Sequence, residues 1–311
     1  MITEHWALEF LPWDFQCVFW CDSGRSQCKF IQGNIGSQTL GFLDVMSDKF
    51  LNCAPPCDVL LGGFPCQPFS IQGSGAGTKD TKGRGVIVDG ILNYVKKRRP
   101  RIVILENVLG LVYRHRSTLD NVVATLTTYG YAASWSILDM YVHGGVPCRR
   151  ARVYIVGLLA PATGGSSCSP SMQWPEPIPC APLSTIFDDD VKLINYSTYP
   201  IQKVNGNMRK NLEHSLEKVI AVGKMQSKDP TEYCVVADLG GNRLNMGWGL
   251  APCLTKTRGQ AHAFWSMQHG RPLTVREMCR LQGLNPDWLN VNVTSRQMGG
   301  WLFLAMGLPA Q

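Results

Sequence analysis

The chain of 311 residues is long enough for one large domain, or for a large domain with a smaller one, and its apolar fraction of 45% is sufficient for a core. No run of about eighteen apolar residues predicts a membrane span, and the first residues lack the pattern of a secretory signal. The net charge of +7 is a mild bias towards polyanions, compatible with nucleic acid.

The cysteine and histidine content points to an intracellular protein without metal. Twelve cysteines in a chain without a visible secretion signal are typical of reduced thiols. No CxxC pair occurs, and the six histidines are scattered along the chain. We therefore expect neither a zinc site nor another metal site.

Two short strands are predicted early in the chain, and each ends near an aspartate. Residues 17–21 predict a strand followed by Asp22. An acidic residue at the end of the second strand of a doubly wound sheet can bind ribose hydroxyls, although a helix-capping aspartate explains Asp22 equally well. Residues 42–45 indicate another strand end, which carries Asp44.

A cysteine lies in a constrained turn after the next strand. Residues 58–61 predict a buried strand, and the sequence GGFPCQPFS follows at 62–70. Its two prolines fix φ at their own positions and favour extended conformations at Phe64 and Gln67, so Cys66 is held at a defined place. On local grounds a structural cysteine in a Pro-rich turn remains an alternative.

The glycine-rich stretch that follows, 73–77, neither follows a strand directly nor opens a clear helix. We reject a dinucleotide-binding fingerprint there and expect a mobile loop that closes over a substrate.

Strands and helices then alternate up to residue 158. Helices are predicted at 86–97 and 117–129, and strands at 101–105, 131–138 and 153–157. This alternation predicts an α/β fold with a doubly wound, mainly parallel sheet. The strand at 101–105 leads into Glu106, a position where open α/β sheets place their chemistry. The basic run 96–101 could touch phosphates or could be a solvated helix end.

The pattern changes after residue 158, and we predict three parts: a catalytic core at 1–158, a smaller, irregular domain at 159–270, and a segment returning to the core at 271–311. The stretch 161–182 is rich in Pro, Gly and Ser. In the last segment, Thr274 is a plausible N-cap, Glu277 completes a capping box, and Gly283 ends the helix.

Four motifs occur in a fixed order along the chain: GGFPCQPFS at 62–70, ENV at 106–108, RARVYIVG at 150–157 and RPLTVREMCRLQGL at 271–284. Together they resemble the cytosine-C5 DNA methyltransferase family over most of the chain. The ending Phe69-Ser70 resembles the DNA-directed branch rather than the tRNA-directed relatives.

The resemblance implies a Rossmann-like methyltransferase core and a role for each matching residue. Cys66 would be the nucleophile that adds to C6 of cytosine, and Glu106 would protonate N3. Arg150 and Arg152 would hold the base and the catalytic loop. Taken singly, these residues are equally well explained as a core thiol, a surface carboxylate and ordinary cations.

The resemblance also implies the cofactor S-adenosyl-L-methionine. Asp22 would bind its ribose and Asp44 its adenine, and Phe64 and Pro65 would line the cofactor and base pocket. The substrate-binding residues would be Gln67, Ser70 and Asn107.

Double-stranded DNA is the implied partner, with the target cytosine flipped out of the stack and 159–270 acting as the target-recognition domain. We expect a monomer without membrane association, in the nucleus of a eukaryote or the cytoplasm of a bacterium.

The chain departs from the family in three places. The family's opening strand and Gly-rich turn would fall before residue 1, which is expected to leave backbone groups of the sheet unpaired. Cys148 stands where the family has glutamine, and Gly299-Gly300 replaces a glycine-asparagine pair. Two alternatives therefore remain: a catalytically impaired DNA-binding or regulatory homologue without cofactor binding, and an RNA cytosine methyltransferase.

Overall fold

The computed structural model describes residues 16–35, 39–64, 87–160, 172–188, 192–201, 204–242, 244–287, 289 and 303–307. The chain divides into two compact units. Unit 1 comprises Met1–Leu138, Ala151–Pro175 and Gly300–Gln311, and unit 2 comprises Asp139–Arg150 and Glu176–Gly299.

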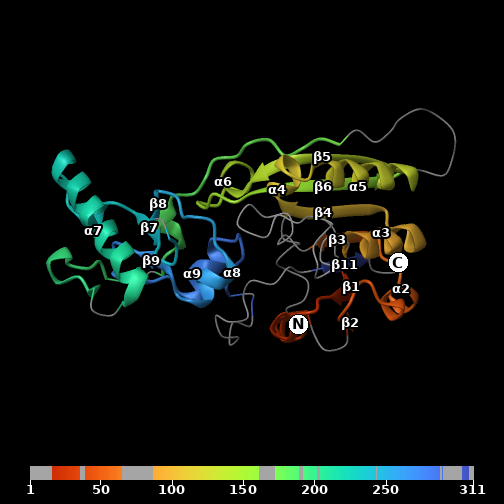
Figure 1. Cartoon of the computed structure of the whole chain (residues 1–311), viewed down its shortest axis with the longest axis horizontal. Helices are drawn as coiled ribbons and strands as arrows, with labels where there is room; N and C mark the ends of the chain where they lie inside the picture. The colour runs from red at the N-terminus through yellow and green to blue at the C-terminus, as the bar shows by residue number, and fades with distance from the viewer. Residues whose placement is uncertain are drawn as a thin grey trace. The chain divides into compact units, whose positions relative to one another are not determined.

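Unit 1 is built around a seven-stranded sheet in the order β2-β1-β11-β3-β4-β6-β5 (Figure 1). Strands β1 to β4 run in one direction, β11 is antiparallel to β1 and β3, and β6 is antiparallel to β4. This confirms the predicted α/β class. The elements are β1 (Gln16–Cys21), α1 (Arg25–Ile35), β2 (Leu40–Phe42), α2 (Asp48–Cys53), β3 (Val59–Gly63), α3 (Ile87–Arg98), β4 (Ile102–Val108), α4 (Gly110–Tyr113), α5 (Arg116–Thr128), β5 (Tyr131–Asp139), β6 (Ala151–Leu159) and β11 (Phe303–Gly307).

Strand β11 corrects one expectation. It lies between β1 and β3 and is antiparallel to both. From the sequence, the sheet is expected to keep unpaired backbone groups. Between β1 and β3 this expectation is wrong, because β11 pairs with both strands. The departure at Gly299-Gly300 lies outside the described residues.

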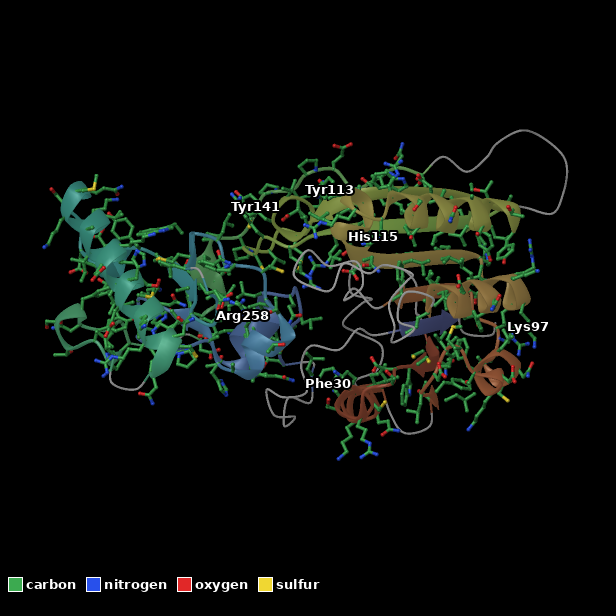
Figure 2. The ribbon with its side chains drawn as sticks, viewed as in Figure 1. Phe30, Lys97, Tyr113, His115, Tyr141 and Arg258 are labelled. Carbon is green, nitrogen blue, oxygen red and sulfur yellow. The ribbon has the colours of Figure 1, made fainter. Side chains whose placement is uncertain are left out.

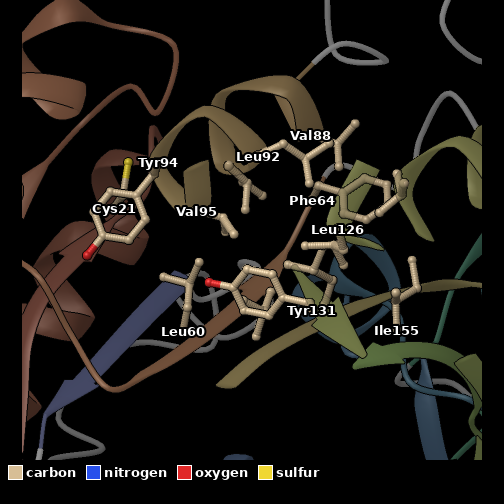
Figure 3. Packing of buried hydrophobic residues seen from close by; sticks show 14 of the residues in the cluster. Cys21, Leu60, Phe64, Val88, Leu92, Tyr94, Val95, Leu126, Tyr131 and Ile155 are labelled. Carbon is tan, nitrogen blue, oxygen red and sulfur yellow. The ribbon is translucent and has the colours of Figure 1, made fainter. Parts of the chain in front are cut away.

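The core of unit 1 lies between the sheet and helices α3 and α5. Phe19 of β1 is fully buried, and its ring meets that of Tyr94 on α3 at a centroid distance of 5.3 Å. Figure 3 shows Leu92 and Val95 of α3 in the same cluster as Leu60 of β3. Because side chains alternate along a strand, Trp20 points to the other face, where it packs with α1.

The basic residues at the end of α3 form hydrogen bonds to Asn52 on α2 and to Tyr129 after α5. Lys97, which Figure 2 labels on α3, donates to Oδ1 of Asn52 at 2.7 Å. Arg98 donates to the backbone oxygen of Asn52 at 2.8 Å. The Arg99 side chain donates to the backbone oxygen of Tyr129. These contacts favour the helix-end interpretation of this run over phosphate contacts.

Unit 2 contains a four-stranded sheet in the order β10-β9-β7-β8. One face packs against α7 through a cluster that includes Leu212 and Leu216, and the other face packs against α9 through a cluster that includes Met278. The elements are α6 (Met140–His143), α7 (Gly206–Gln226), β7 (Val235–Asp238), β8 (Asn245–Trp248), α8 (Lys256–Gln260), β9 (Phe264–Ser266), β10 (Arg271–Pro272) and α9 (Val275–Arg280), with 3₁₀ turns at Leu183–Ile186, Tyr196–Thr198 and Pro230–Glu232.

The capping box predicted for α9 is confirmed. Oγ1 of Thr274 accepts from the backbone N–H of Glu277 at 3.1 Å, and the Glu277 carboxylate accepts from the backbone N–H of Thr274 at 2.8 Å. Gly283 follows with φ of +72°. Unit 2 takes α9 together with most of 159–270, whereas the sequence analysis grouped the segment after 270 with the catalytic core. The three-part functional division stays a prediction.

Candidate active site

The candidate site lies along one edge of the sheet in unit 1. Asp22 follows β1, Phe64 follows β3, and Glu106 is near the end of β4. Because these strands share a direction, their carboxyl ends lie along the same edge. Gly63 of β3 pairs directly with Glu106 of β4. Cys66 comes three positions after Gly63 in the chain.

Four of the predicted site residues lie outside the described part of the chain. They are Pro65, Cys66, Gln67 and Ser70. The strand that leads to them and the strand beside it are described, and they carry the geometry of the site.

Glu106 and Arg152 form an ion pair across two neighbouring strands. Nε of Arg152 lies 3.0 Å from Oε1 of Glu106. β4 and β6 are antiparallel with Val108 opposite Arg152, so Glu106 lies on the same face as Arg152, one diagonal away. The side chains keep 17% and 14% of their surface exposed, respectively. The pair holds the carboxylate at the edge of the sheet, where Oε2 is buried and part of the rest of the side chain stays exposed.

Asn107 fastens β4 to the segment that leads to Cys66. Its side chain is fully buried, and Nδ2 donates to the backbone oxygen of Phe64 at 3.2 Å. The bond ties β4 to the residue just before Pro65. The Phe64 ring lies fully buried in the core cluster (Figure 3). The predicted substrate and cofactor roles of Asn107 and Phe64 stay predictions.

The two predicted cofactor carboxylates follow paired strand ends. Cys21 of β1 is opposite Phe42 of β2, and the backbone N–H of Asp22 donates to the Phe42 oxygen at 3.1 Å. Burial, together with the charges of Asp22 and Asp44, raises the pKa of the Cys21 thiol to about 12. The strand pairing therefore brings both carboxylates to the same edge of the sheet.

Each carboxylate also has a local role. Oδ1 of Asp22 accepts from the backbone N–H of Gly24 at 2.7 Å, in the turn that opens α1. Asp44 is exposed, and its Oδ1 accepts from the backbone N–H of Met46 at 2.9 Å. The bond of Asp22 lies in the turn before α1 and not within the helix, so the helix-capping interpretation and the ribose role both stay predictions.

Arg150 belongs to unit 2, where its guanidinium approaches a thiol. Nη1 lies 3.9 Å from Sγ of Cys253. The preceding residues pair with the same stretch, since Cys148 forms a parallel bridge with Ala251 and its buried thiol donates to the Pro252 oxygen at 3.7 Å. Sequence reasoning missed Cys253 because this partner is 103 positions away and carries no local signal.

No group of three or more His, Cys, Asp or Glu side chains in the described part of the chain could hold a metal ion. No helix in that part of the chain is both long and apolar enough to cross a membrane.

A solved structure resembles this chain in its fold. The Dnmt2 methyltransferase of S. pombe has a similar fold, with a TM-score of 0.51 and 17% identity, over 90% of this chain and 83% of that chain. The two chains therefore share an α/β fold.

The family follows from sequence comparison. The family model described as C-5 cytosine-specific DNA methylase matches residues 6–299. This chain belongs to that family.

Two bacterial relatives have the same sequence identity to this chain. The Type II methyltransferase M.NgoBI of Neisseria gonorrhoeae is 29% identical, over 86% of this chain and 74% of the relative. The Type II methyltransferase M.AplI of Arthrospira platensis is also 29% identical, over 82% of this chain and 72% of the relative.

Proposed function

We propose that this DNA methyltransferase methylates C5 of a flipped-out cytosine through a transient bond between Cys66 and C6 of the base. The observation that carries the proposal is the Glu106–Arg152 ion pair beside the strand that leads to Cys66. It supports a carboxyl group in a defined position, close to where the nucleophile enters the site.

The chemistry needs a nucleophile and an acid around one planar ring. When Sγ of Cys66 bonds to C6, electron density moves towards C5, and a proton given by Glu106 to N3 offsets the developing charge. Arg152 orients that carboxyl group. Once C5 carries the methyl group, a base from solvent takes the C5 proton, and the electrons of that C–H bond form the C5–C6 double bond as the bond between C6 and sulfur breaks and frees the Cys66 thiolate. N3 returns its proton to Glu106.

The methyl donor is S-adenosyl-L-methionine, which when bound supplies an electrophilic methyl group. The carboxylates of Asp22 and Asp44 fit this group, because they follow paired strand ends at the edge where open α/β sheets bind ribose and adenine. Asp22 would accept from the ribose hydroxyls, and Asp44 would accept from the adenine amine.

Double-stranded DNA is the proposed substrate, supported by the family and by the two bacterial relatives named as type II methyltransferases. Residues 159–270 would read the target sequence. Arg150 would hold the base, as predicted from its motif.

The proposal is tested with duplex DNA that carries 5-fluorocytosine in place of cytosine. Fluorine cannot leave C5 as a cation, so the enzyme should stay covalently attached after methyl transfer. We expect a covalent complex that is stable in denaturing gels and depends on S-adenosyl-L-methionine.

Cys66→Ala should abolish that complex, while Cys53→Ala, at an exposed cysteine on α2, should leave it intact. A complex that survives Cys66→Ala would remove Cys66 as the nucleophile.

Two further measurements address the alternatives. If the protein is a DNA-binding homologue without cofactor binding, a calorimetric titration with S-adenosyl-L-methionine should release or absorb no heat. An RNA methyltransferase predicts faster methyl transfer to tRNA than to duplex DNA.

A further inference from the structure

Strand β11 occupies an unusual place in the sheet of unit 1. It comes from the last residues of the chain, yet it lies in the interior of the sheet, between β1 and β3 (Figure 1). Leu304 pairs with Trp20 on one side and with Leu61 on the other. Ala305 pairs with Phe19 and Leu60 in the same way.

β1 and β3 are also linked by contacts that do not involve β11. Phe19 of β1 packs edge-on against Tyr94 of α3, the helix that follows β3 in the chain. On the other face, Leu61 of β3 packs against the cluster formed by Trp20 and α1. These contacts hold β1 and β3 two strand spacings apart, about 9.6 Å, which is too far for a direct backbone hydrogen bond.

A position of this kind has a definite chemical requirement. Phe19, Trp20 and Leu60 are all buried, so water cannot satisfy the backbone groups that β1 and β3 turn towards each other. An extended peptide between the two strands can form hydrogen bonds with the backbone groups of β1 and with those of β3. It must be apolar and must lack proline, since proline removes a backbone donor. The sequence Phe-Leu-Ala-Met-Gly at 303–307 meets both conditions.

We propose that the space between β1 and β3 is a two-sided binding site for an extended apolar peptide. The chain fills it with its own β11, which thereby acts as a positioning element for the cofactor site. Phe303 is opposite Cys21, the residue before Asp22, and Leu304 is opposite Leu61, close to the end of β3. β11 therefore bridges the strand that presents Asp22 and the strand that leads to Cys66, and its backbone pairing fixes their register.

The strand pairing is tested in the full chain by cysteine substitution. The register places Met306 opposite Cys17 and Phe303 opposite Cys21, and cross-strand neighbours lie within disulfide reach. Met306→Cys should form a disulfide with Cys17, and Phe303→Cys should form one with Cys21. Leu304→Cys is the matched control, because neither of its partners is a cysteine.

Oxidation with diamide at alkaline pH followed by peptide mass spectrometry identifies the linked pairs. Alkaline conditions are needed because burial raises the pKa of Cys17 to about 11 and, together with nearby acidic charges, that of Cys21 to about 12. The exchanged pairing, with Met306→Cys linked to Cys21, would show a parallel strand and overturn the proposal. A Leu304→Cys disulfide with either thiol would overturn the register.

The positioning role is tested with Ala305→Pro, which removes the central N–H of β11, and with Ala305→Gly, which keeps it. Ala305→Pro should speed amide hydrogen exchange in both β1 and β3 and weaken binding of S-adenosyl-L-methionine about tenfold or more. Ala305→Gly should change both quantities much less. Unchanged exchange in either β1 or β3 would show that the site is not two-sided.

A trans experiment identifies the site as a peptide-binding site. A chain ending at residue 302 should bind a synthetic peptide of residues 303–311 and regain the amide protection of β1 and β3. If that chain does not fold, the full-length Ala305→Pro variant decides alone. The cofactor measurement rests on the proposed function, but the disulfide and exchange measurements do not. Wild-type protein that fails to bind cofactor yet shows the expected disulfides would count against the function and not against the strand site.

Discussion

Two glutamate–arginine pairs, one in each unit, differ in how fully the carboxylate is enclosed. Glu277 in unit 2 has no exposed side-chain surface, and it accepts from both terminal nitrogens of Arg271, at 2.6 and 2.8 Å. The backbone N–H groups of Thr274 and Asp188 donate to it as well. Glu106 in unit 1 keeps part of its side chain exposed at the edge of the sheet.

The difference separates a structural carboxylate from one that can take part in chemistry. Four donors hold Glu277 as an acceptor of hydrogen bonds, and a group so enclosed cannot hand a proton to a ligand. Glu106 is paired through Oε1 and keeps 17% of its side-chain surface exposed, which is compatible with the proposed role as an acid. Arg209 and Glu213 on α7 form a third pair, which is about half exposed and serves as a reference.

The largest expected effect is on turnover. Glu106→Gln keeps the shape of the side chain but removes the ionisable proton, so kcat should fall about 10²–10⁴-fold. DNA binding, measured by fluorescence anisotropy, should change little.

Glu213→Gln is the matched control, because it neutralises a glutamate that is also paired with arginine. Equal turnover of Glu106→Gln and wild type would exclude the acid role. A loss in Glu213→Gln as large as that in Glu106→Gln would point to a general effect of charge removal.

The next effect is on stability. Glu277→Ala should lower the free energy of unfolding by about 3–5 kcal/mol, because it leaves Arg271 without its buried partner and removes the capping box of α9. Urea denaturation followed by circular dichroism measures this loss. Glu277→Gln should cost less, since glutamine can still accept from the Thr274 N–H. A midpoint that does not move in Glu277→Ala would contradict the structural role.

A smaller effect is expected from substitution of Asn107, which should lower both the stability of the protein and the rate of trapping. Asn107→Ala leaves the buried oxygen of Phe64 without this donor and should cost about 1–3 kcal/mol of stability. It should also slow the trapping of 5-fluorocytosine DNA, because the segment before Cys66 loses its anchor.

Asn211→Ala is the control for that experiment. Asn211 on α7 is buried and donates to the Leu239 and Gly241 oxygens at 2.8 Å, so it should lose similar stability without slower trapping. If both variants trap equally slowly, the Asn107 effect is one of stability alone.

The smallest effect is expected at the exposed pair. Arg209→Ala should change the free energy of unfolding by about 0.3–0.5 kcal/mol and leave turnover unchanged, because solvent screens the interaction. A loss above that range, measured by urea denaturation, would mean that exposure is a poor guide to the contribution of these pairs.

Much of unit 1 was predictable from local pattern. Buried strands such as β3 and β4 are short runs of β-branched and aliphatic residues, and α3 has apolar residues at helical spacing. The capping box of α9 needs only two residues three positions apart. Cys66 and Glu106 were located because strongly patterned motifs surround them, although their roles stay predictions.

The partners of the site residues were not predictable in the same way. The contact of Arg150 with Cys253 and the bond from Asn107 to Phe64 join residues that are far apart in the chain. Nothing in the residues themselves marks such a pair, because both side chains occur in many other settings. Arg271 was read as part of a helical motif, and its enclosure of Glu277 became visible only when β10 and α9 were placed together.

Local pattern, with the order of four motifs, was therefore enough to establish the α/β class, the family and the elements that carry the candidate site. The position of β11 and the pairing of Glu106 with Arg152 were decided by the tertiary structure. The physical reason is one of range. Propensity, capping and periodicity act over a few residues, whereas a strand finds its neighbours by satisfying buried backbone groups wherever the folded sheet leaves them.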